Sequence, residues 1–307
     1  MRGFKQIDVL NSTKINEAEL SSEINIEIAV LKGLDIFTSA HVQGVVKTTT
    51  AMCQKMRMSY EDTKKCVLAA YLHDIGKIKI PPEILQKTSK LTEEEYQEMK
   101  KHTIYGYEIC MEYQNFRHLA SIVRAHHENL DGTGYPDGLK GDEIPKEASL
   151  IKVADVYDAL TQRRQYKDGY KQSEALKLML NDVKAGKMSD DMYEILLFTV
   201  IEQLENSLAT HVNNVQKYHN NLEILHELER IYKEIYDRGL TKKLEKKLAK
   251  FELAPGYDMS TNANLLIVKQ KALEKEMEWK NLCESEITEI NKLMKELYKF
   301  AWENKKN

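Results

Sequence analysis

The sequence contains few cysteines, little net charge and no long hydrophobic run. Its 307 residues include four cysteines that lie far apart without a CxxC pair, so we expect reduced, mostly buried thiols rather than a disulfide framework. No apolar stretch approaches the roughly 20 residues that span a bilayer, and the N-terminal stretch holds no hydrophobic core of a signal peptide. The net charge of -3 provides no basic field for wrapping a nucleic acid. These absences predict a cytoplasmic protein whose partners include neither a membrane nor a nucleic-acid polymer.

Prolines are also scarce and are unevenly placed. Four of the five lie in the first half of the chain, and Pro255 stands alone in the second half. Almost every other stretch shows helical periodicity, and strand-type alternation is scarce, so we predict an all-α protein. We divide it into an N-terminal lead (1–22), a helical domain (23–195) and a C-terminal helical extension (196–307).

The extension is predicted to consist of long, highly charged helices. Apolar residues from Ile287 to Ala301 recur at alternating gaps of three and four, as in the seam of a bundle or coiled coil. The stretch from Ala254 to Asn264 is expected to separate two such helices. Three histidines are interpreted as surface residues because no carboxylate arrangement matches them: His211, His219 and His226. We expect this part to serve in packing, dimerisation or regulation, with a homodimer through these helices as one hypothesis.

The stretch from His73 to Lys77 reads HDIGK and offers two different metal ligands at adjacent positions, an imidazole and a carboxylate. The preceding segment is predicted to form a helix with Ser59 as its N-cap and Leu72 near its end, and Gly76 is expected to terminate it. The ligand pair would then lie at a buried helix terminus, where a carboxylate needs a strong partner. The alternative is a hydrogen-bonded His–Asp pair in a core, and the dipeptide alone does not exclude it.

Further imidazoles and one carboxylate lie on other predicted helices. A helix with Thr92 as its N-cap and Glu95 in a capping box reaches His102. Asp155 lies on an apolar helix, where an unpaired carboxylate is costly, and the alternative is an exposed helix face shared with Asp158. A single histidine is more often a satisfied core residue than a ligand, and a tandem pair can lie on a surface. The candidates of this second set are His41, His102, His126, His127 and Asp155.

A long irregular run separates the tandem histidines from the helix of Asp155. Residues 131–142 contain so many turn-forming residues that a helix is excluded there. A loop of this length inside a compact domain is usually functional or disordered. Because Tyr135 is followed by the rigid Pro136, we expect an ordered lip rather than a flexible linker.

The combined candidates suit two metal ions better than one. Five imidazoles and two carboxylates exceed the needs of a single ion, whereas two cations about 3.5–4 Å apart that share one carboxylate would use them all. Nitrogen and oxygen ligands without thiolate suit Fe, Mn or another first-row ion. A hydroxide held between two such cations is a good nucleophile toward a phosphodiester. The seven candidate ligands are His41, His73, Asp74, His102, His126, His127 and Asp155.

With these motifs in place, the sequence resembles the HD-GYP phosphodiesterases, a branch of the HD superfamily. The matching stretches are HDIGK at 73–77, HHENLDGTGYPDGLKGDEIP at 126–145 and ADVYDALT at 154–161. The resemblance implies an all-α HD core and hydrolysis of cyclic di-GMP to pGpG or GMP. It also implies that one ion is held by His41, His73, Asp74 and Asp155, and that Asp74 bridges to a second ion held by His102, His126 and His127.

The same resemblance assigns further residues to catalysis and to the substrate: Asp74 and Lys77 to the reaction centre, Tyr135 to the substrate pocket, and Arg164 and Lys167 to phosphate contacts. Lys77 would touch the phosphate or the bridging hydroxide. Members with a third metal carry a glutamate four residues before the first histidine, and here that position is Phe37, so we expect two metals. The usual Arg-Pro-Tyr reads Arg-Gln-Tyr at 164–166, which keeps the cation.

Two other functions remain open at this level. The same chemistry would serve another cyclic dinucleotide such as cyclic GMP-AMP, because the base-contacting residues are not evident in the sequence. A non-catalytic cyclic di-GMP receptor is the second alternative, although receptors usually lose ligands or the GYP loop and this chain keeps both. No receiver, sensor or membrane-spanning pattern is found before the domain, so we expect regulation by the C-terminal helices or by metal supply.

Overall fold

The computed structural model describes residues 36–162, 169–239, 241–248 and 262–304. These ranges contain helices and loops without a strand, apart from one isolated bridge between Asp131 and Lys140, so the all-α prediction is confirmed. The expected lead at 1–22 and most of the break expected between Ala254 and Asn264 lie outside the described residues. None of the described helices combines the length and the apolar character needed to cross a bilayer.

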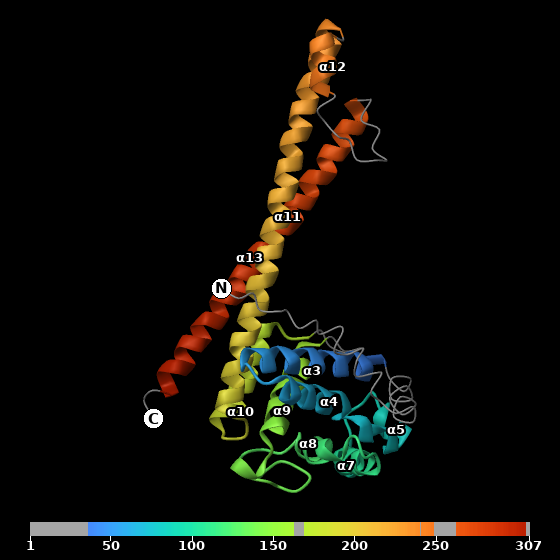
Figure 1. The fold of residues 1–307 in the computed structure, drawn as a ribbon, viewed down its shortest axis with the longest axis vertical. Coiled ribbons are helices and arrows are strands. Elements are labelled where there is room, and N and C mark those ends of the chain that lie inside the picture. The colour runs from blue at the N-terminus through green and yellow to red at the C-terminus, as the bar shows by residue number, and fades with distance from the viewer. Residues whose placement is uncertain (1–35, 163–168, 240, 249–261, 305–307) are drawn as a thin grey trace. The chain divides into compact units, whose positions relative to one another are not determined.

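The chain forms two compact units, one of residues 1–200 with 296–307 and one of residues 201–295. In the first unit, α3 (Ile36–Lys55) packs against α4 (Tyr60–Leu72) and α9 (Lys146–Thr161), while α7 (His102–Glu112) packs against α8 (Ala120–Ala125) (Figure 1). The turn η1 (Ile75–Lys79) also packs against α7. The boundaries expected from the sequence at 22 and 195 stay predictions. The helical elements that lie in or enter this unit are α3 (Ile36–Lys55), α4 (Tyr60–Leu72), η1 (Ile75–Lys79), α5 (Pro82–Leu85), α6 (Glu93–Lys100), α7 (His102–Glu112), η2 (Arg117–Leu119), α8 (Ala120–Ala125), η3 (Gly141–Glu143), α9 (Lys146–Thr161), α10 (Gln172–Lys184) and the start of α11 (Asp190–Arg238).

Two helix starts follow directly from local sequence. The Ser59 side chain accepts a hydrogen bond from the backbone N–H of Asp62 at 3.1 Å and caps α4. At α6, the Thr92 hydroxyl accepts from the Glu95 N–H at 3.2 Å, and the Glu95 carboxylate accepts from the Thr92 N–H at 2.7 Å. Two of the backbone donors at the helix start are therefore satisfied reciprocally, as the capping-box pattern predicts.

The expectation that Gly76 ends the helix of the HD motif is wrong. The helix α4 ends at Leu72 with His73 as its C-cap, and Gly76 lies inside the following turn η1. A Cβ atom at position 76 would lie 2.0 Å from the carbonyl oxygen of His102. Gly76 is therefore required for the close approach of η1 to α7, which brings the HD motif next to His102.

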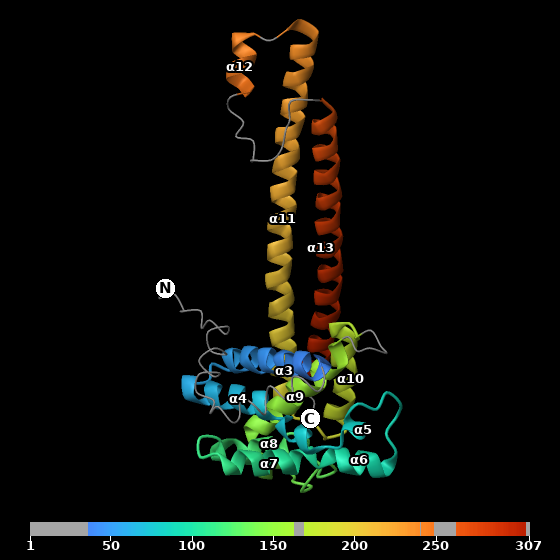
Figure 2. The same cartoon turned by 90° about the vertical axis from the view of Figure 1, so that its right-hand side faces the viewer.

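The second unit is an antiparallel pair formed by α11 and α13 (Asn262–Asn304) (Figure 2). The short helix α12 (Lys242–Leu248) comes between these two helices in the chain order. Leu222, Leu225 and Leu228 of α11 pack with Ala272 of α13. The helix α11 ends earlier than expected, because Gly239 adopts a left-handed backbone with φ of 78°. A homodimer through these helices stays a prediction.

One interpretation of the extension needs correction. His211 is not a plain surface residue, because its Nδ1 lies 2.8 Å from the Glu286 carboxylate of α13 and its side chain is only 17% exposed. The Ser207 hydroxyl donates to the same carboxylate at 2.5 Å. His219 is half-exposed and pairs with Glu276 at 3.3 Å, whereas His226 is exposed, as expected. The missing carboxylates come from a helix more than 50 residues later in the chain.

Candidate metal centre

Three of the candidate histidines are held in the same way at helix termini. Each imidazole donates its Nδ1–H to the backbone carbonyl three residues earlier, at 2.6–2.8 Å. A carbonyl can only accept, so each ring carries its proton on Nδ1 and leaves Nε2 as a free electron pair. This is the arrangement in which protein histidines ligate metals through Nε2. The three pairs are His73 with Ala70, His102 with Met99, and His126 with Val123.

The unprotonated Nε2 atoms of these three histidines are suited to binding a cation. The Nε2 atom of His73 is buried and lacks a hydrogen-bond partner among the described residues. The Nε2 atoms of His102 and His126 face each other at 3.3 Å. Since both protons are on Nδ1, neither Nε2 can donate to the other, and two buried acceptors in contact are unfavourable without a positive charge between them. The donor set therefore suits metal binding.

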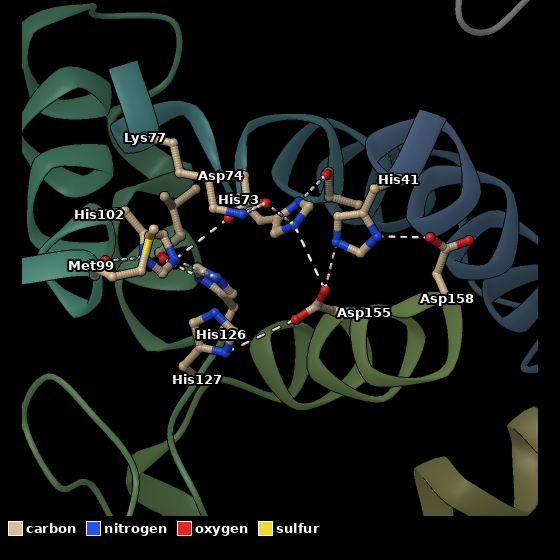
Figure 3. A network of polar contacts seen from close by, with 12 residues as sticks. His41, His73, Asp74, Lys77, Met99, His102, His126, His127, Asp155 and Asp158 are labelled. Carbon is tan, nitrogen blue, oxygen red and sulfur yellow. Dashed lines mark hydrogen bonds and ion pairs between the residues drawn. The ribbon is translucent and has the colours of Figure 1, made fainter. Parts of the chain in front are cut away.

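The first ligand group joins three helices around one carboxylate (Figure 3). His41 of α3 and His73 at the end of α4 approach Asp155 of α9. The distances from Asp155 Oδ1 are 2.9 Å to His41 Nε2 and 4.0 Å to His73 Nε2. His73 is 1% exposed and Asp155 8%, so this group lies in the core that α3, α4 and α9 build together.

The second ligand group consists of His102, His126 and His127, from the start of α7 and the end of α8. The His126 and His127 rings lie 4.1 Å apart, and each lies within 5.3 Å of the His102 ring, measured between centroids. Burial lowers the pKa of His102 to about 4 and that of His127 to about 3, and it holds the pKa of His126 well below its usual value. These imidazoles are therefore neutral at pH 7, as metal ligands must be.

Asp74 connects the two groups. Its Oδ2 lies 3.3 Å from His73 Nε2 in the first group, and its Oδ1 lies 3.5 Å from His102 Nε2 in the second. Burial alone would raise the pKa of Asp74, but Lys77, His73 and His102 hold it well below its usual value. The Lys77 ammonium pairs with Asp74 Oδ2 at 2.5 Å. An ionised carboxylate with one oxygen facing each group is the geometry that a bridging ligand requires.

Asp158 belongs to the site, although the sequence analysis considered it only as part of an exposed helix face shared with Asp155. Its Oδ2 accepts a hydrogen bond from His41 Nδ1 at 2.7 Å, and its side chain is only 13% exposed. This bond leaves His41 Nε2 directed at Asp155 (Figure 3). A Cβ atom on Gly44 of α3 would lie 1.8 Å from Asp158 Oδ1, so the glycine makes room for the carboxylate.

Charge balance around His41 differs from that of the other histidines. Burial lowers the pKa of His41, but the carboxylates of Asp155 and Asp158 outweigh it and raise the pKa to about 9. Burial likewise opposes ionisation of Asp155, yet His41, His127 and His73 hold its pKa far below the usual range. Without metal, His41 is therefore a cation between two carboxylates, and a bound metal would take the place of its Nε2 proton.

The loop that follows the tandem histidines is ordered by Glu128. This residue belongs to the motif at 126–145, but the motif alone did not indicate its role. Glu128 is 1% exposed, and its Oε1 accepts hydrogen bonds from the N–H groups of Asp137 at 2.7 Å and Gly138 at 3.1 Å. Arg124 holds the same segment with two hydrogen bonds to the Asp137 carboxylate, at 2.6 and 2.8 Å. The prediction of an ordered lip is thus matched by specific contacts.

Tyr135 lies at the inner side of this loop, against the second ligand group. Its ring centroid is 4.8 Å from that of His127 with an interplanar angle of 31°, and 6.4 Å from that of His102. Its backbone N–H also donates to the His127 carbonyl at 3.4 Å. Tyr135 is therefore placed beside the candidate metal centre. Arg164 and Lys167 lie outside the described residues.

The family model described as the HD domain matches residues 19–188. The chain belongs to the HD domain family. Its two ligand groups and the carboxylate between them occupy the matched stretch, and the resemblance to the HD-GYP branch is confirmed by relatives that are named cyclic di-GMP phosphodiesterases.

Three curated relatives illustrate the range of named substrates in this HD domain family. The cyclic di-GMP phosphodiesterase response regulator RpfG of Xanthomonas campestris is 42% identical over 45% of this chain and 37% of its own length. The 3'3'-cGAMP-specific phosphodiesterase 1 of Vibrio cholerae is 30% identical over 65% of this chain and 48% of its own length. A cyclic di-GMP phosphodiesterase of Thermotoga maritima is 41% identical over 44% of this chain and 37% of its own length. The chain thus matches less than half the length of each.

Proposed function

We propose that this HD domain protein is a metal-dependent phosphodiesterase that hydrolyses cyclic di-GMP to pGpG or GMP. The observation that carries the proposal is the ionised Asp74 with one oxygen facing each of two ligand groups, 3.3 Å from His73 Nε2 and 3.5 Å from His102 Nε2. Relatives named cyclic di-GMP phosphodiesterases support the substrate.

The residues of the chain would hold two divalent cations, with Fe or Mn as the proposed identities. One would be held by His41, His73 and Asp155, the other by His102, His126 and His127, with Asp74 shared between them. When bound, the cations would supply a nucleophile from water at neutral pH and neutralise charge on the phosphoryl group. The buried, partnerless Nε2 of His73 and the two acceptors of His102 and His126 support this role.

The remaining residues would bind and orient the substrate. Lys77 places an ammonium at Asp74, within reach of a phosphate that enters the centre. Tyr135 borders the second ligand group and would form a wall of the substrate pocket. The Glu128 carboxylate accepts hydrogen bonds from the backbone N–H groups of Asp137 and Gly138 and would fix this wall. The pocket would then be preorganised before the substrate binds. Arg164 and Lys167 are proposed as further phosphate contacts.

A second cyclic dinucleotide is the alternative that a specific observation favours. The relative from Vibrio cholerae that aligns over 65% of this chain is named a 3'3'-cGAMP-specific phosphodiesterase. The ligand groups would hold the cations that act on a phosphodiester, a bond that both cyclic dinucleotides contain, so the same centre would serve either substrate. The choice must depend on residues outside the ligand groups.

The test is hydrolysis by anaerobically purified protein loaded with Fe or Mn, with cyclic di-GMP and cyclic GMP-AMP assayed separately. We expect turnover of cyclic di-GMP that is lost in Asp74→Ala, because removal of the shared carboxylate disconnects the two groups. Faster turnover of cyclic GMP-AMP would transfer the proposal to that substrate. Two bound metals without turnover of either would contradict the proposed enzyme and favour a receptor.

A further inference from the structure

A lysine outside the two ligand groups lies over the ring of Tyr135. Lys100 is the last residue of α6, two positions before His102. Its Nζ lies 4.9 Å from the ring centroid of Tyr96 and 5.7 Å from that of Tyr135. Both distances are in the range of cation–π contacts. Two aromatic faces thus hold this ammonium in place at the C-terminal end of a helix, which also favours a cation.

The partners of Lys100 differ from those of the neighbouring lysines. Lys101 pairs with Glu98 at 2.5 Å, Lys87 with Glu95 at 2.5 Å, and Lys77 with Asp74 at 2.5 Å. Within the described residues, Lys100 forms no ion pair with a carboxylate. An oriented, half-buried ammonium without an anion is available to bind one.

Tyr135 connects this ammonium to the metal centre. The Tyr135 ring contacts Lys100 on one hand and the candidate ligand His127 on the other, at 4.8 Å between ring centroids. A ligand atom at Lys100 is therefore separated from the second ligand group by about one aromatic ring. Glu128 fixes the loop that carries Tyr135, so the spacing between the two sites is set by ordered structure.

We infer that Lys100 binds the phosphate that is not being cleaved. A cyclic dinucleotide carries two phosphodiesters in one ring, so when one of them enters the metal centre the other must lie a short distance away and needs its own cation. The compact ammonium of a lysine suits a phosphate oxygen from many directions. This inference rests on the proposed function, and it adds a substrate contact on α6, ahead of the HD-GYP loop.

The test compares Lys100→Met with the adjacent Lys101→Met, whose lysine pairs with Glu98 instead of the tyrosines. The substrates are cyclic di-GMP, cyclic GMP-AMP, cyclic di-AMP and bis(p-nitrophenyl) phosphate, which has one phosphodiester and no second phosphate. We expect Lys100→Met to raise KM by roughly 10-fold to 100-fold for every cyclic dinucleotide that the wild type cleaves, as loss of a charged hydrogen bond implies. Metal content and turnover of bis(p-nitrophenyl) phosphate should stay unchanged, and Lys100→Arg should restore most of the affinity.

Each other outcome is decisive. Equal losses with bis(p-nitrophenyl) phosphate would place Lys100 at the metal centre and overturn the inference. A loss with guanine-containing substrates alone would mean that the lysine reads a base, and an unchanged KM would leave it without a substrate role; both contradict the inference while the proposed function stands. A wild type that cleaves bis(p-nitrophenyl) phosphate but no cyclic dinucleotide would refute the proposed function, and the inference with it.

Discussion

The contact between Asp158 and His41 allows a quantitative prediction about metal binding. Asp158 fixes one nitrogen of His41 at 2.7 Å and so directs the other toward Asp155 and the proposed metal position. Loss of such a partner typically weakens metal affinity by 10–100-fold, or about 1.4–2.8 kcal/mol. In Asp158→Asn the amide oxygen still accepts the bond without a charge, so we expect about 10-fold, and in Asp158→Ala about 100-fold. The weakening should affect one metal only, since His102, His126 and His127 do not contact Asp158.

A second substitution tests the same contact without changing any charged residue. In Gly44→Ala the added methyl group would lie 1.8 Å from Asp158 Oδ1, so the carboxylate must shift, and we expect this shift to disturb its hydrogen bond to His41. Isothermal titration with Mn and metal counting by mass spectrometry should show the same result in Asp158→Asn and Gly44→Ala. One site should bind metal more weakly, and the other should keep its wild-type affinity. The exposed Asp142→Asn serves as the charge-matched control, and circular dichroism checks the fold. Two sites of wild-type affinity in both Asp158→Asn and Gly44→Ala would refute the reasoning.

Three further predictions concern the loop, a helix cap and pH. Glu128→Ala should raise KM and speed proteolysis within 131–142 at unchanged metal content, because the loop loses its two backbone bonds to the Glu128 carboxylate; unchanged proteolysis would contradict this. Thr92→Ala should cost about 1 kcal/mol of unfolding free energy in a denaturant titration through loss of the α6 cap, whereas Thr241→Ala, at the start of α12, should leave α6 unaffected. Metal affinity at the first ligand group should rise as pH increases toward 9, because the raised pKa of His41 keeps this ligand protonated at lower pH. Calorimetry that detects no proton release on metal binding at pH 7 would contradict this prediction.

The predictions from sequence succeeded where the signal is local. The capping box of Thr92 and Glu95 depends on residues three apart and appears as expected. The N-cap at Ser59 is equally local. The seven candidate ligands were collected from separate helices by side-chain chemistry and by family motifs, and the structure brings them together in two groups with Asp74 between them. Helical periodicity was sufficient for the fold class because almost every segment is a helix.

Features that depend on contacts between distant segments were missed. Asp158 was an ambiguous acid because its partner His41 is 117 residues away and the space for it comes from Gly44. Gly76 looked like a helix terminator, yet it is needed where η1 touches the His102 backbone. The Glu286 partner of His211 is likewise 75 residues away. In each case the sequence shows the residue type, but only the packing of helices shows what the residue contacts.

The most direct test of the proposed two-cation centre is turnover measured while metal is added stepwise to metal-free protein. Cyclic di-GMP hydrolysis should be near zero up to one equivalent of Mn or Fe and should rise to a plateau at two equivalents, because the shared Asp74 needs both ligand groups filled. A plateau at one equivalent, or hydrolysis by fully metal-free protein, would contradict the claim that two cations joined by Asp74 perform the reaction.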